Sequence, residues 1–463
     1  MSITRRTLLV GAGTGAVAVL LAACTPEPTP KPTRTTTPAP KPSAPADVPT
    51  PAAWARSTWT SDPYSFGAVS YVPAGADPRR RETLAVPVMD RLFFAGEATD
   101  ADNPGTVIGA VDSGRRAGMG LLAAASEPER IAVIGAGAAG VAAARMAADA
   151  GHAVTVFEAR ERTGGRLLTL DDDEWPVPVQ LGAWLIGEDD VAALDARLIT
   201  ISDKRIRLDS AVGWSSDGAT DSVDGAPIAQ AVENASALPT DVPVTEALEQ
   251  NGVDPAEPAI TAALAWLAAT SGADPTRASS WYPPTFAPDA LNALTGDLSA
   301  FIDESLSEID VALASPVVRV AYDDRGVSLR LGTGESLSFD RVIITAPLGV
   351  LQQQGIEFAP ALPFEHRGAI ADLASGFIET VWMRFDEPFW AAEEAIWHVV
   401  GGDGLIRTWL NLLPATGEPV LVGLVGGAAA EQFAALSERD AKVAARASLA
   451  FFAPEPDQEP DQG

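Results

Sequence analysis

The stretch IAVIGAGAAG at residues 131–140 constrains the fold of this chain more than any other feature. Its opening apolar run is typical of a buried parallel strand. Gly135, Gly137 and Gly140 follow with the spacing G-x-G-x-x-G. The first glycine permits a tight turn, the second lets backbone approach a pyrophosphate, and the third lets a helix pack on the strand. The stretch therefore predicts a strand, a phosphate-binding loop and a helix.

A helix and a second strand complete this predicted unit. The helix includes Ala138 and Ala139 and runs to Ala150, and its N-terminus attracts phosphates. The second strand covers residues 153–157 and ends in Glu158, which is placed to bind both hydroxyls of an adenosine ribose. A G-x-G-x-x-G spacing alone is weak evidence, but here strand, loop, helix, strand and acid occur in register. The sequence predicts an α/β, Rossmann-like dinucleotide site, and at this point NAD and FAD both stay open.

The next residues resemble a known family. Residues 158–166 read EARERTGGR and resemble the E-A-R-x-R-x-G-G-R segment of the flavin amine oxidases. The resemblance implies that the cofactor is FAD, with the paired glycines and the last arginine beside its diphosphate and flavin. The cofactor-binding residues implied in this part of the chain are Ala159, Arg160, Gly164, Gly165, Arg166, Gly182 and Ala183.

A second stretch, RLFFAGEATDADNPGTVIGAVDSGRRAG at residues 91–118, predicts a strand followed by a helix. The strand stops at Gly96. Asp102 or Asn103 is then expected to cap the helix, with Pro104 in its first turn. The N-terminus of this helix would place partial positive charge near a bound ligand.

This stretch closely resembles the C-terminal motif of the same family, usually FAGEAT…GTVxGAxxSG. The resemblance implies that the motif lies at the flavin, with Glu97 near the ribityl chain. The cofactor-binding residues implied here are Gly96, Glu97, Gly105, Thr106 and Val107.

The order of the motifs is reversed relative to the family. Residues 59–71, WTSDPYSFGAVSY, resemble the W-x-x-DP-x-x-x-GSYS segment that precedes the C-terminal motif, and both come before the fingerprint. Residues 315–351 resemble the family's central segment, in which Val317 is implied to contact adenine. We therefore interpret the chain as a circularly permuted flavin amine oxidase. Permutation is tolerated when the original termini lie close together on the surface.

The predicted fold is an α/β, Rossmann-like FAD-binding domain of the GR2 type, with an interleaved substrate domain of helices and an antiparallel sheet. The permutation predicts that the strand at residues 92–95 lies in the same sheet region as the strand at 131–134, and that Trp54 and Phe452 are neighbours. The predicted segments are a signal peptide (1–24), a disordered Pro/Thr-rich linker (25–51), the permuted C-terminal FAD-binding segment (52–124), the Rossmann segment (125–190), a helical substrate part (191–310), a central FAD-domain segment (311–350), the substrate-domain sheet and helix (351–452) and a disordered tail (453–463).

Three departures from the family pattern concern the chemistry. Ala68 stands where some members attach FAD through a cysteine, so FAD is expected to be noncovalent. Val69 and Thr106 stand where many members build an aromatic cage, whose loss weakens the case for a simple amine substrate. Gln352 stands where many members have a lysine that holds a water at the flavin. We expect slow reoxidation by dioxygen, and faster reoxidation after Gln352→Lys.

Four aromatic residues of the helical part could rebuild such a cage: Trp214, Trp266, Trp281 and Tyr282. Core packing is the commoner role for residues of this kind.

The first residues resemble an export signal. TRRTLL at residues 4–9 is a twin-arginine pattern, and the apolar run after it ends in LAAC at residues 21–24, like a bacterial lipobox. Cys24, the single cysteine, would be lipidated; the alternative is an uncleaved membrane anchor. We expect export by the twin-arginine route and attachment to the outer face of the bacterial cell membrane through the lipid anchor only.

Composition excludes some functions. The formal net charge is −30, from 62 acidic and 32 basic residues, which argues against binding of nucleic acid. One cysteine and three histidines supply a metal site poorly, and no metal is expected.

The resemblance implies FAD-dependent oxidation of a C–N bond of a small amine or amino acid to an imine, with hydrogen peroxide formed if dioxygen is the acceptor. Two alternatives stay open. One is a flavin dehydrogenase or desaturase of the same fold with another electron acceptor. The other is a flavin-binding surface module with little turnover.

Overall fold

The computed structural model describes residues 48–126, 128–187, 205–287, 291–296 and 298–453. The predicted signal peptide with Cys24 lies outside these ranges. In the described part of the chain, no helix is both long and apolar enough to cross a membrane. The described residues belong to one compact unit, so residues 54–124 do not form a separate domain.

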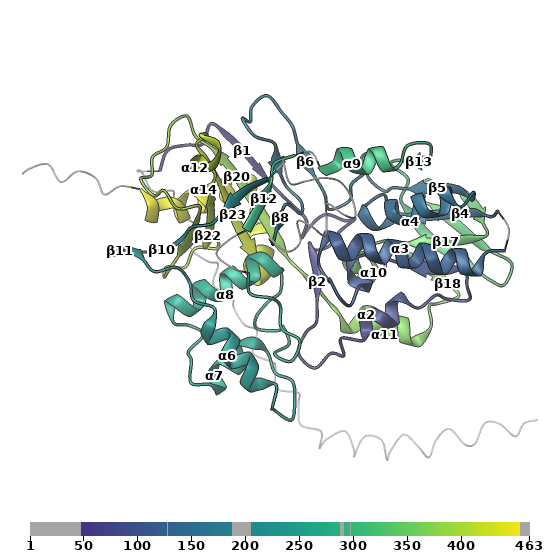
Figure 1. Ribbon diagram of the computed structural model, residues 1–463, viewed down its shortest axis with the longest axis horizontal. Coiled ribbons are helices and arrows are strands. Elements are labelled where there is room, and N and C mark those ends of the chain that lie inside the picture. Colours follow the sequence, from purple (N-terminus) through teal and green to yellow (C-terminus); the bar gives the residue numbers. More distant parts are fainter. Residues whose placement is uncertain (1–47, 127, 188–204, 288–290, 297, 454–463) are drawn as a thin grey trace, which may run out of the picture. The chain divides into compact units, whose positions relative to one another are not determined.

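A five-stranded parallel sheet carries the predicted nucleotide-binding unit (Figure 1). Its strands, in spatial order, are β13 (Asp310–Ala312), β5 (Ala153–Phe157), β4 (Arg130–Ile134), β17 (Arg341–Ile344) and β3 (Leu92–Phe94). All neighbours are parallel. Strands β3 and β17 are buried along their whole length, and all their residues are apolar except Arg341, whose buried guanidinium pairs with Glu129. The predicted strands are confirmed, and the strand at Leu92–Phe94 lies in the same sheet as the one at Arg130–Ile134.

Helix α3 (Val107–Ala124) packs against α4 (Ala138–Asp149), as Figure 1 shows. Glycines allow the close approach. A Cβ added to Gly114 would lie 2.2 Å from the carbonyl oxygen of Ala139, and one added to Gly118 would lie 2.8 Å from Met146 Sδ. The segment that precedes the fingerprint is therefore built into the nucleotide-binding unit.

Helix α3 begins later than the sequence predicted. Its N-cap is Thr106, whose hydroxyl accepts a hydrogen bond from the backbone N–H of Gly109 (3.0 Å) and donates one to the carbonyl of Asn103 (2.8 Å). The prediction that Asp102 or Asn103 caps the helix was therefore wrong, and Pro104 lies before the first turn. The extended backbone of Thr106 (φ −116°, ψ 161°) explains the later start, since an N-cap is not helical.

A second, seven-stranded sheet contains strands of the segment 351–452, where a substrate-domain sheet was predicted, together with β1 from the segment 52–124. Its strands, in spatial order, are β1 (Ala53–Arg56), β20 (Ile378–Arg384), β23 (Val420–Gly426), β22 (Thr408–Asn411), β21 (Ile396–Val399), β10 (Ala211–Ser215) and β11 (Gly218–Thr220). Neighbours are antiparallel except β10 and β21, which are parallel. Trp54 on β1 and Phe452 pack into the same hydrophobic cluster as Trp397 and Trp409. Residues near both ends of the described chain thus share one core.

Smaller sheets complete the described strands: β16 (Ser336–Phe339), β15 (Val327–Leu331), β14 (Val317–Tyr322) and β18 (Glu357–Ala359); β8 (Leu185–Ile186), β12 (Leu291–Leu294) and β9 (Arg205–Leu208); β19 (Ala374–Gly376) and β2 (Val69–Tyr71); β6 (Thr169–Leu170) and β7 (Val179–Gln180).

The remaining described helices are α2 (Arg80–Ala85), η2 (Glu97–Thr99), α6 (Ala226–Ala235), α7 (Val244–Gln250), α8 (Pro258–Ser271), α9 (Leu298–Ser305), α10 (Leu348–Gln352), α11 (Phe364–Asp372), α12 (Leu413–Thr416), α13 (Gly427–Ala434), α14 (Glu438–Ser448) and η3 (Leu449–Phe452). The segment predicted to be helical, residues 191–310, contains α6 to α9 and also contributes strands, including β10 of the seven-stranded sheet.

Candidate functional site

A cavity of about 770 Å³ is lined both by the loops of the parallel sheet and by strands of the seven-stranded sheet. This volume lies in the range of about 300–1,000 Å³ typical of small-molecule sites. The loops form what we call the cofactor end of the cavity. Residues of β8, α8, β12, β20 and β23 form what we call its substrate end.

The fingerprint loop contributes the first wall of the cofactor end. Gly135 has φ +105°, and a Cβ there would lie 2.5 Å from Thr345 Oγ1, so only glycine fits. A Cβ on Gly140 would lie 1.9 Å from the carbonyl oxygen of Gly135, which explains the third glycine. Helix α4 starts after Gly137, where the structure shows no side-chain cap. Its first N–H groups are left to bind an anionic ligand.

Glu158 lies at the end of β5 with 3% of its surface exposed. Its carboxylate accepts hydrogen bonds from the backbone N–H groups of Ala136 and Arg160, each at 2.9 Å. These two bonds fix the carboxylate at the cavity wall and leave it lone pairs for two hydroxyl donors. The glycine pair is next to the fingerprint, since a Cβ on Gly165 would lie 3.2 Å from Gly137 Cα. The buried acid, the close backbone and the uncapped helix together fit an adenosine diphosphate.

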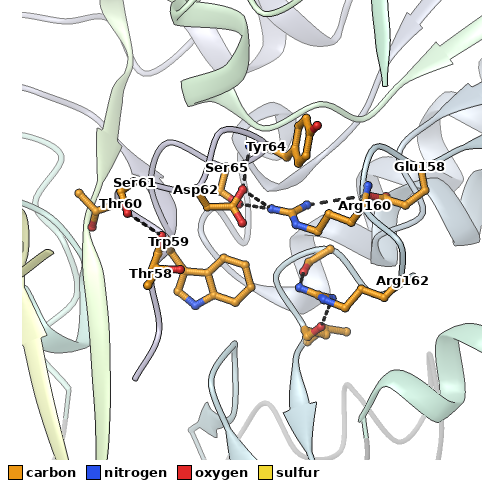
Figure 2. Close-up of polar contacts among 12 residues, drawn as sticks. Thr58, Trp59, Thr60, Ser61, Asp62, Tyr64, Ser65, Glu158, Arg160 and Arg162 are labelled. Carbon is orange, nitrogen blue, oxygen red and sulfur yellow. Dashed lines mark hydrogen bonds and ion pairs between the residues drawn. The ribbon is translucent and has the colours of Figure 1, made fainter. Parts of the chain in front are cut away.

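Arg160 ties this wall to a segment about a hundred residues earlier in the chain (Figure 2). Its Nη2 donates to Asp62 Oδ1 at 2.7 Å and to Ser65 Oγ at 2.8 Å. Its Nη1 lies 3.9 Å from Glu158 Oε1. The guanidinium carbon lies 5.9 Å and 5.6 Å from the ring centroids of Trp59 and Tyr64, which is the range of cation–π contacts. The loop at residues 59–65 is thereby held against the cofactor end.

Glu97 is the buried acid of the C-terminal motif. Its Oε2 accepts hydrogen bonds from Ser70 Oγ (2.6 Å) and the backbone N–H of Gly105 (3.0 Å), and its Oε1 accepts one from Arg166 Nη1 (3.1 Å). Burial alone would raise the pKa of Glu97, but the charges of Arg166 and Arg81 and the bond from Ser70 outweigh it, so the net pKa is lowered. Glu97 is therefore an anion that fixes Arg166 and the loop before α3.

The predicted cofactor-binding residues line the cavity, apart from Gly140, which packs the helix. Those that line it are Gly96, Glu97, Gly105, Thr106, Val107, Gly135, Gly137, Ala138, Ala139, Glu158, Ala159, Arg160, Gly164, Gly165, Arg166, Gly182, Ala183 and Val317. Val69 and Thr106, which stand at the two positions where many family members have an aromatic cage, also line the cavity.

Gln352 is placed differently from the sequence-based expectation, because it is not among the lining residues. Its Nε2 donates to the carbonyls of Ile370 (2.9 Å) and Leu373 (2.7 Å), and its Oε1 accepts from Ser375 Oγ (3.0 Å). The amide is thus bonded behind the cavity wall. It could face the cofactor only after these bonds are released.

At the substrate end, the structure brings to the cavity an aromatic side chain that the sequence analysis did not single out, Trp184. Trp184 follows the predicted pair Gly182 and Ala183, lines the cavity, and has only 3% of its surface exposed. Its ring packs on Trp382, with centroids 5.0 Å apart. One indication in the sequence that Trp184 reaches the cavity was its position directly after two predicted cofactor-binding residues. The four aromatic residues considered from the sequence, Trp214, Trp266, Trp281 and Tyr282, do not line the cavity.

The chain matches the model of the flavin containing amine oxidoreductase family over residues 38–121 and 257–463, which is more than half of its length. Residues 133–191 match an NAD(P)-binding Rossmann-like domain. The protein therefore belongs to the flavin-containing amine oxidoreductase family, and its cofactor is FAD. The residues that line the cofactor end fit this cofactor.

Its relatives include several amine oxidases. The chain is 31% identical to polyamine oxidase 4 of Oryza sativa subsp. japonica, over 68% of this chain and 71% of the relative. It is 27% identical to human lysine-specific histone demethylase 2, over 67% of this chain and 42% of the relative.

Among solved structures, putrescine oxidase bound to putrescine (TM-score 0.55, 20% identity, 71% of this chain and 82% of that one) has a similar fold. So does cyclohexylamine oxidase from Brevibacterium oxydans (TM-score 0.55, 19% identity, 70% of this chain and 83% of that one).

Proposed function

We propose that this protein oxidises a C–N bond of a small amine or amino acid to an imine. The observation that carries the proposal is a cavity that joins a built cofactor end to a substrate end with apolar walls. FAD supplies the two-electron acceptor when it is bound. The substrate carbon gives up a hydrogen with two electrons and its nitrogen gives up a proton. Dioxygen, if it is the final acceptor, takes two electrons and two protons and leaves as hydrogen peroxide.

The residues of the chain bind and orient the reactants. Glu158 would hold the ribose hydroxyls, and the N-terminus of α4 would hold the diphosphate. The N-terminus of α3, capped by Thr106, faces the cavity and favours negative charge there. Apolar walls at the substrate end would exclude water from the reacting carbon.

Two other functions remain candidates, the first of them because Gln352 holds the position of the family lysine. One is a dehydrogenase or desaturase that passes electrons to another acceptor. The other is a flavin-binding module with little turnover.

Anaerobic mixing of purified holoprotein with a panel of amines and amino acids tests these functions. We expect at least one amine to bleach the flavin absorbance and to yield peroxide in air. Bleaching without peroxide would favour a dehydrogenase. Flavin that dithionite bleaches but no compound of the panel bleaches would favour the module.

The FAD is proposed to be noncovalent. Ala68 stands where some family members carry the attaching cysteine, and it lines the cavity. Acid precipitation should therefore leave yellow flavin in the supernatant, whereas flavin retained on the peptide would contradict the proposal.

Circular permutation is a proposal supported by several observations. Strand β3 and helix α3, which come before the fingerprint, pack beside β17 and α4. The family match falls in two pieces on either side of the Rossmann match. A rearranged gene that moves residues 52–124 behind residue 452 should yield a protein that binds FAD. Failure of that protein to fold, with the native order folding normally, would count against the proposal.

Export and lipid attachment through Cys24 are likewise proposed, from the sequence at residues 4–24. Cys24→Ala should abolish incorporation of labelled palmitate in a bacterial host. Continued labelling would show that Cys24 is not the lipidated residue.

A further inference from the structure

The loop before α3 lies where the cofactor end of the cavity meets its substrate end. A Cβ added to Gly105 in this loop would lie 3.6 Å from Val69 Cβ. A Cβ added to Gly272, at the end of α8, would lie 2.5 Å from Val69 Cγ2 and 3.2 Å from Ile378 Cγ1 on β20. Val69 therefore touches elements of both ends. FAD that reacts with a substrate must place its flavin ring where the two ends meet, which is beside this loop.

Arg81 on α2 is a buried cation behind this loop, with only 3% of its surface exposed. Its Nη1 donates to Ser70 Oγ (2.7 Å) and to the carbonyl of Ala98 (3.3 Å), and its Nη2 donates to the carbonyl of Ser70 (3.1 Å). Burial lowers the pKa of Arg81, and the charges of Glu97 and Asp100 oppose this shift, so the guanidinium keeps its proton. A buried charge bonded to neutral oxygens usually costs stability compared with an apolar side chain. Stability alone therefore does not explain an arginine at this position.

Ser70 connects Arg81 to the carboxylate of Glu97. The Ser70 hydroxyl accepts a hydrogen bond from Arg81 and donates its one proton to Glu97 Oε2 at 2.6 Å. Because Arg81 occupies the oxygen of this hydroxyl as a donor, the proton is directed to Glu97. Glu97 in turn accepts from the backbone N–H of Gly105 (3.0 Å) and from Arg166 Nη1 (3.1 Å), and both of these residues line the cavity. A change at Arg81 is thus transmitted to the cavity wall.

The charges of this network leave a positive excess beside the junction of the two ends. Arg166 and Arg81 both lower the pKa of Glu97, and Asp100 interacts with Arg81 and Arg116. Three guanidinium groups share two carboxylates, so one net positive charge remains on these five side chains. A hydride that reaches the flavin brings two electrons and one proton, and therefore one negative charge. A fixed positive charge nearby stabilises that negative charge.

We propose that Arg81 is a positioning residue for flavin reduction, which directs Ser70 onto Glu97 and supplies positive charge that stabilises the reduced flavin. Arg81 is not among the residues that line the cavity, so it acts through Ser70, Glu97 and Arg166 without touching the substrate. The inference rests on the bound FAD and on the proposed oxidation, and it is independent of which amine is oxidised.

The test is the midpoint potential of the flavin in purified holoprotein, measured by slow reduction with xanthine and xanthine oxidase against a reference dye. Arg81→Met removes the charge and keeps a long side chain. We expect its equilibrium constant for two-electron reduction to fall about tenfold, which lowers the potential by about 30 mV. Arg79→Met and Arg80→Met are matched controls, because these neighbouring arginines are more exposed and pair with Asp77 and Asp372. Each control should change the constant by less than about twofold, since solvent screens exposed charges.

Two further variants separate charge from packing. Arg81→Lys keeps the charge and should recover most of the potential. The double variant Arg81→Met with Glu97→Gln loses one positive and one negative charge, so its constant should return to within about threefold of the native value. Two purely structural disturbances would instead add to one another. If Arg81→Met does not fold, Arg81→Gln carries the same test, because it is neutral and can still donate to Ser70.

The outcomes separate this inference from the function on which it rests. A native potential in the Arg81→Met holoprotein would overturn the role of Arg81, and so would an equal fall in Arg80→Met. Failure of every amine to reduce the flavin would overturn the proposed oxidation alone, because xanthine oxidase reduces the flavin without an amine.

Discussion

The Asp62–Arg160 pair offers the sharpest test of how the cofactor end is built. Asp62→Asn keeps the size of the side chain and removes its charge. In the native protein, Asp62 Oδ1 lies 2.7 Å from Arg160 Nη2, and Glu158 Oε1 lies 3.9 Å from Nη1 (Figure 2). Without the charge of Asp62, the guanidinium should move onto Glu158. It would then compete with the ribose hydroxyls for that carboxylate.

The size of the effect follows from the burial of the pair. The side chains of Arg160 and Asp62 are 14% and 21% exposed, so solvent screens them only in part. A hydrogen bond to a charged group contributes about 1.5–3 kcal/mol. Ser65 Oγ still accepts from the same nitrogen, so part of the interaction survives. We expect FAD binding to weaken by about 1–2 kcal/mol, which is roughly a 5- to 30-fold rise in Kd.

The assay is titration of apoprotein with FAD, followed by the quenching of flavin fluorescence. Asp77→Asn is the matched control, because Asp77 pairs with Arg79 at the same 2.7 Å on the exposed surface. It should leave the Kd unchanged. An Asp62→Asn protein with native Kd and native Tm would refute the reasoning, since it would mean that Glu158 does not need Arg160 held away from it.

Three further predictions concern a glycine, a histidine and Gln352. Gly140→Ala should abolish FAD binding because its Cβ would lie 1.9 Å from the carbonyl oxygen of Gly135, whereas Gly120→Ala in α3, with its nearest contact at 3.6 Å, should bind FAD normally in the same titration. Burial lowers the pKa of His398 to about 4, so the folded state disfavours the proton. The contribution of neutral His398 to the free energy of unfolding is therefore fully present above the unfolded pKa of about 6.5. The free energy of unfolding should fall by about 3 kcal/mol as the pH drops to 4, and urea unfolding should show a smaller loss in His398→Gln. Gln352→Lys should leave flavin reoxidation in stopped flow within about twofold, because the two carbonyls that bind the amide would also bind the ammonium away from the cavity; a large acceleration would restore the sequence-based expectation.

The cofactor end was predictable where its determinants are local. The helix after Gly137 and the acid at Glu158 are fixed by neighbours within about thirty residues, and the strand order then brings the loops together. The cap of α3 was mispredicted for a local reason as well. Thr106 and Asn103 are both good caps, and only the backbone conformation decides between them.

The substrate end could not be predicted in the same way. Whether Gln352 faces the cofactor depends on carbonyls 18 and 21 residues further along the chain, which belong to α11 and the turn after it. Trp184 reaches the cavity because Trp382, from a distant strand, supports its ring. Neither contact leaves a periodic pattern in the sequence, so neither side chain's direction follows from its neighbours.

Glu379 shows how contacts between distant residues can make the order of the chain unimportant. It is fully buried on β20 and accepts hydrogen bonds from the Ser57 hydroxyl and from the backbone N–H groups of Trp59 (3.3 Å) and Thr60 (2.8 Å). Burial raises the pKa of Glu379, although these bonds oppose the shift. They hold the start of the 59–65 loop on the seven-stranded sheet, and Arg160 holds its end on the cofactor site. Because both anchors act through space, the loop would be positioned equally well whether its residues precede the fingerprint or follow the last strand, which is the physical condition that a circular permutation must meet.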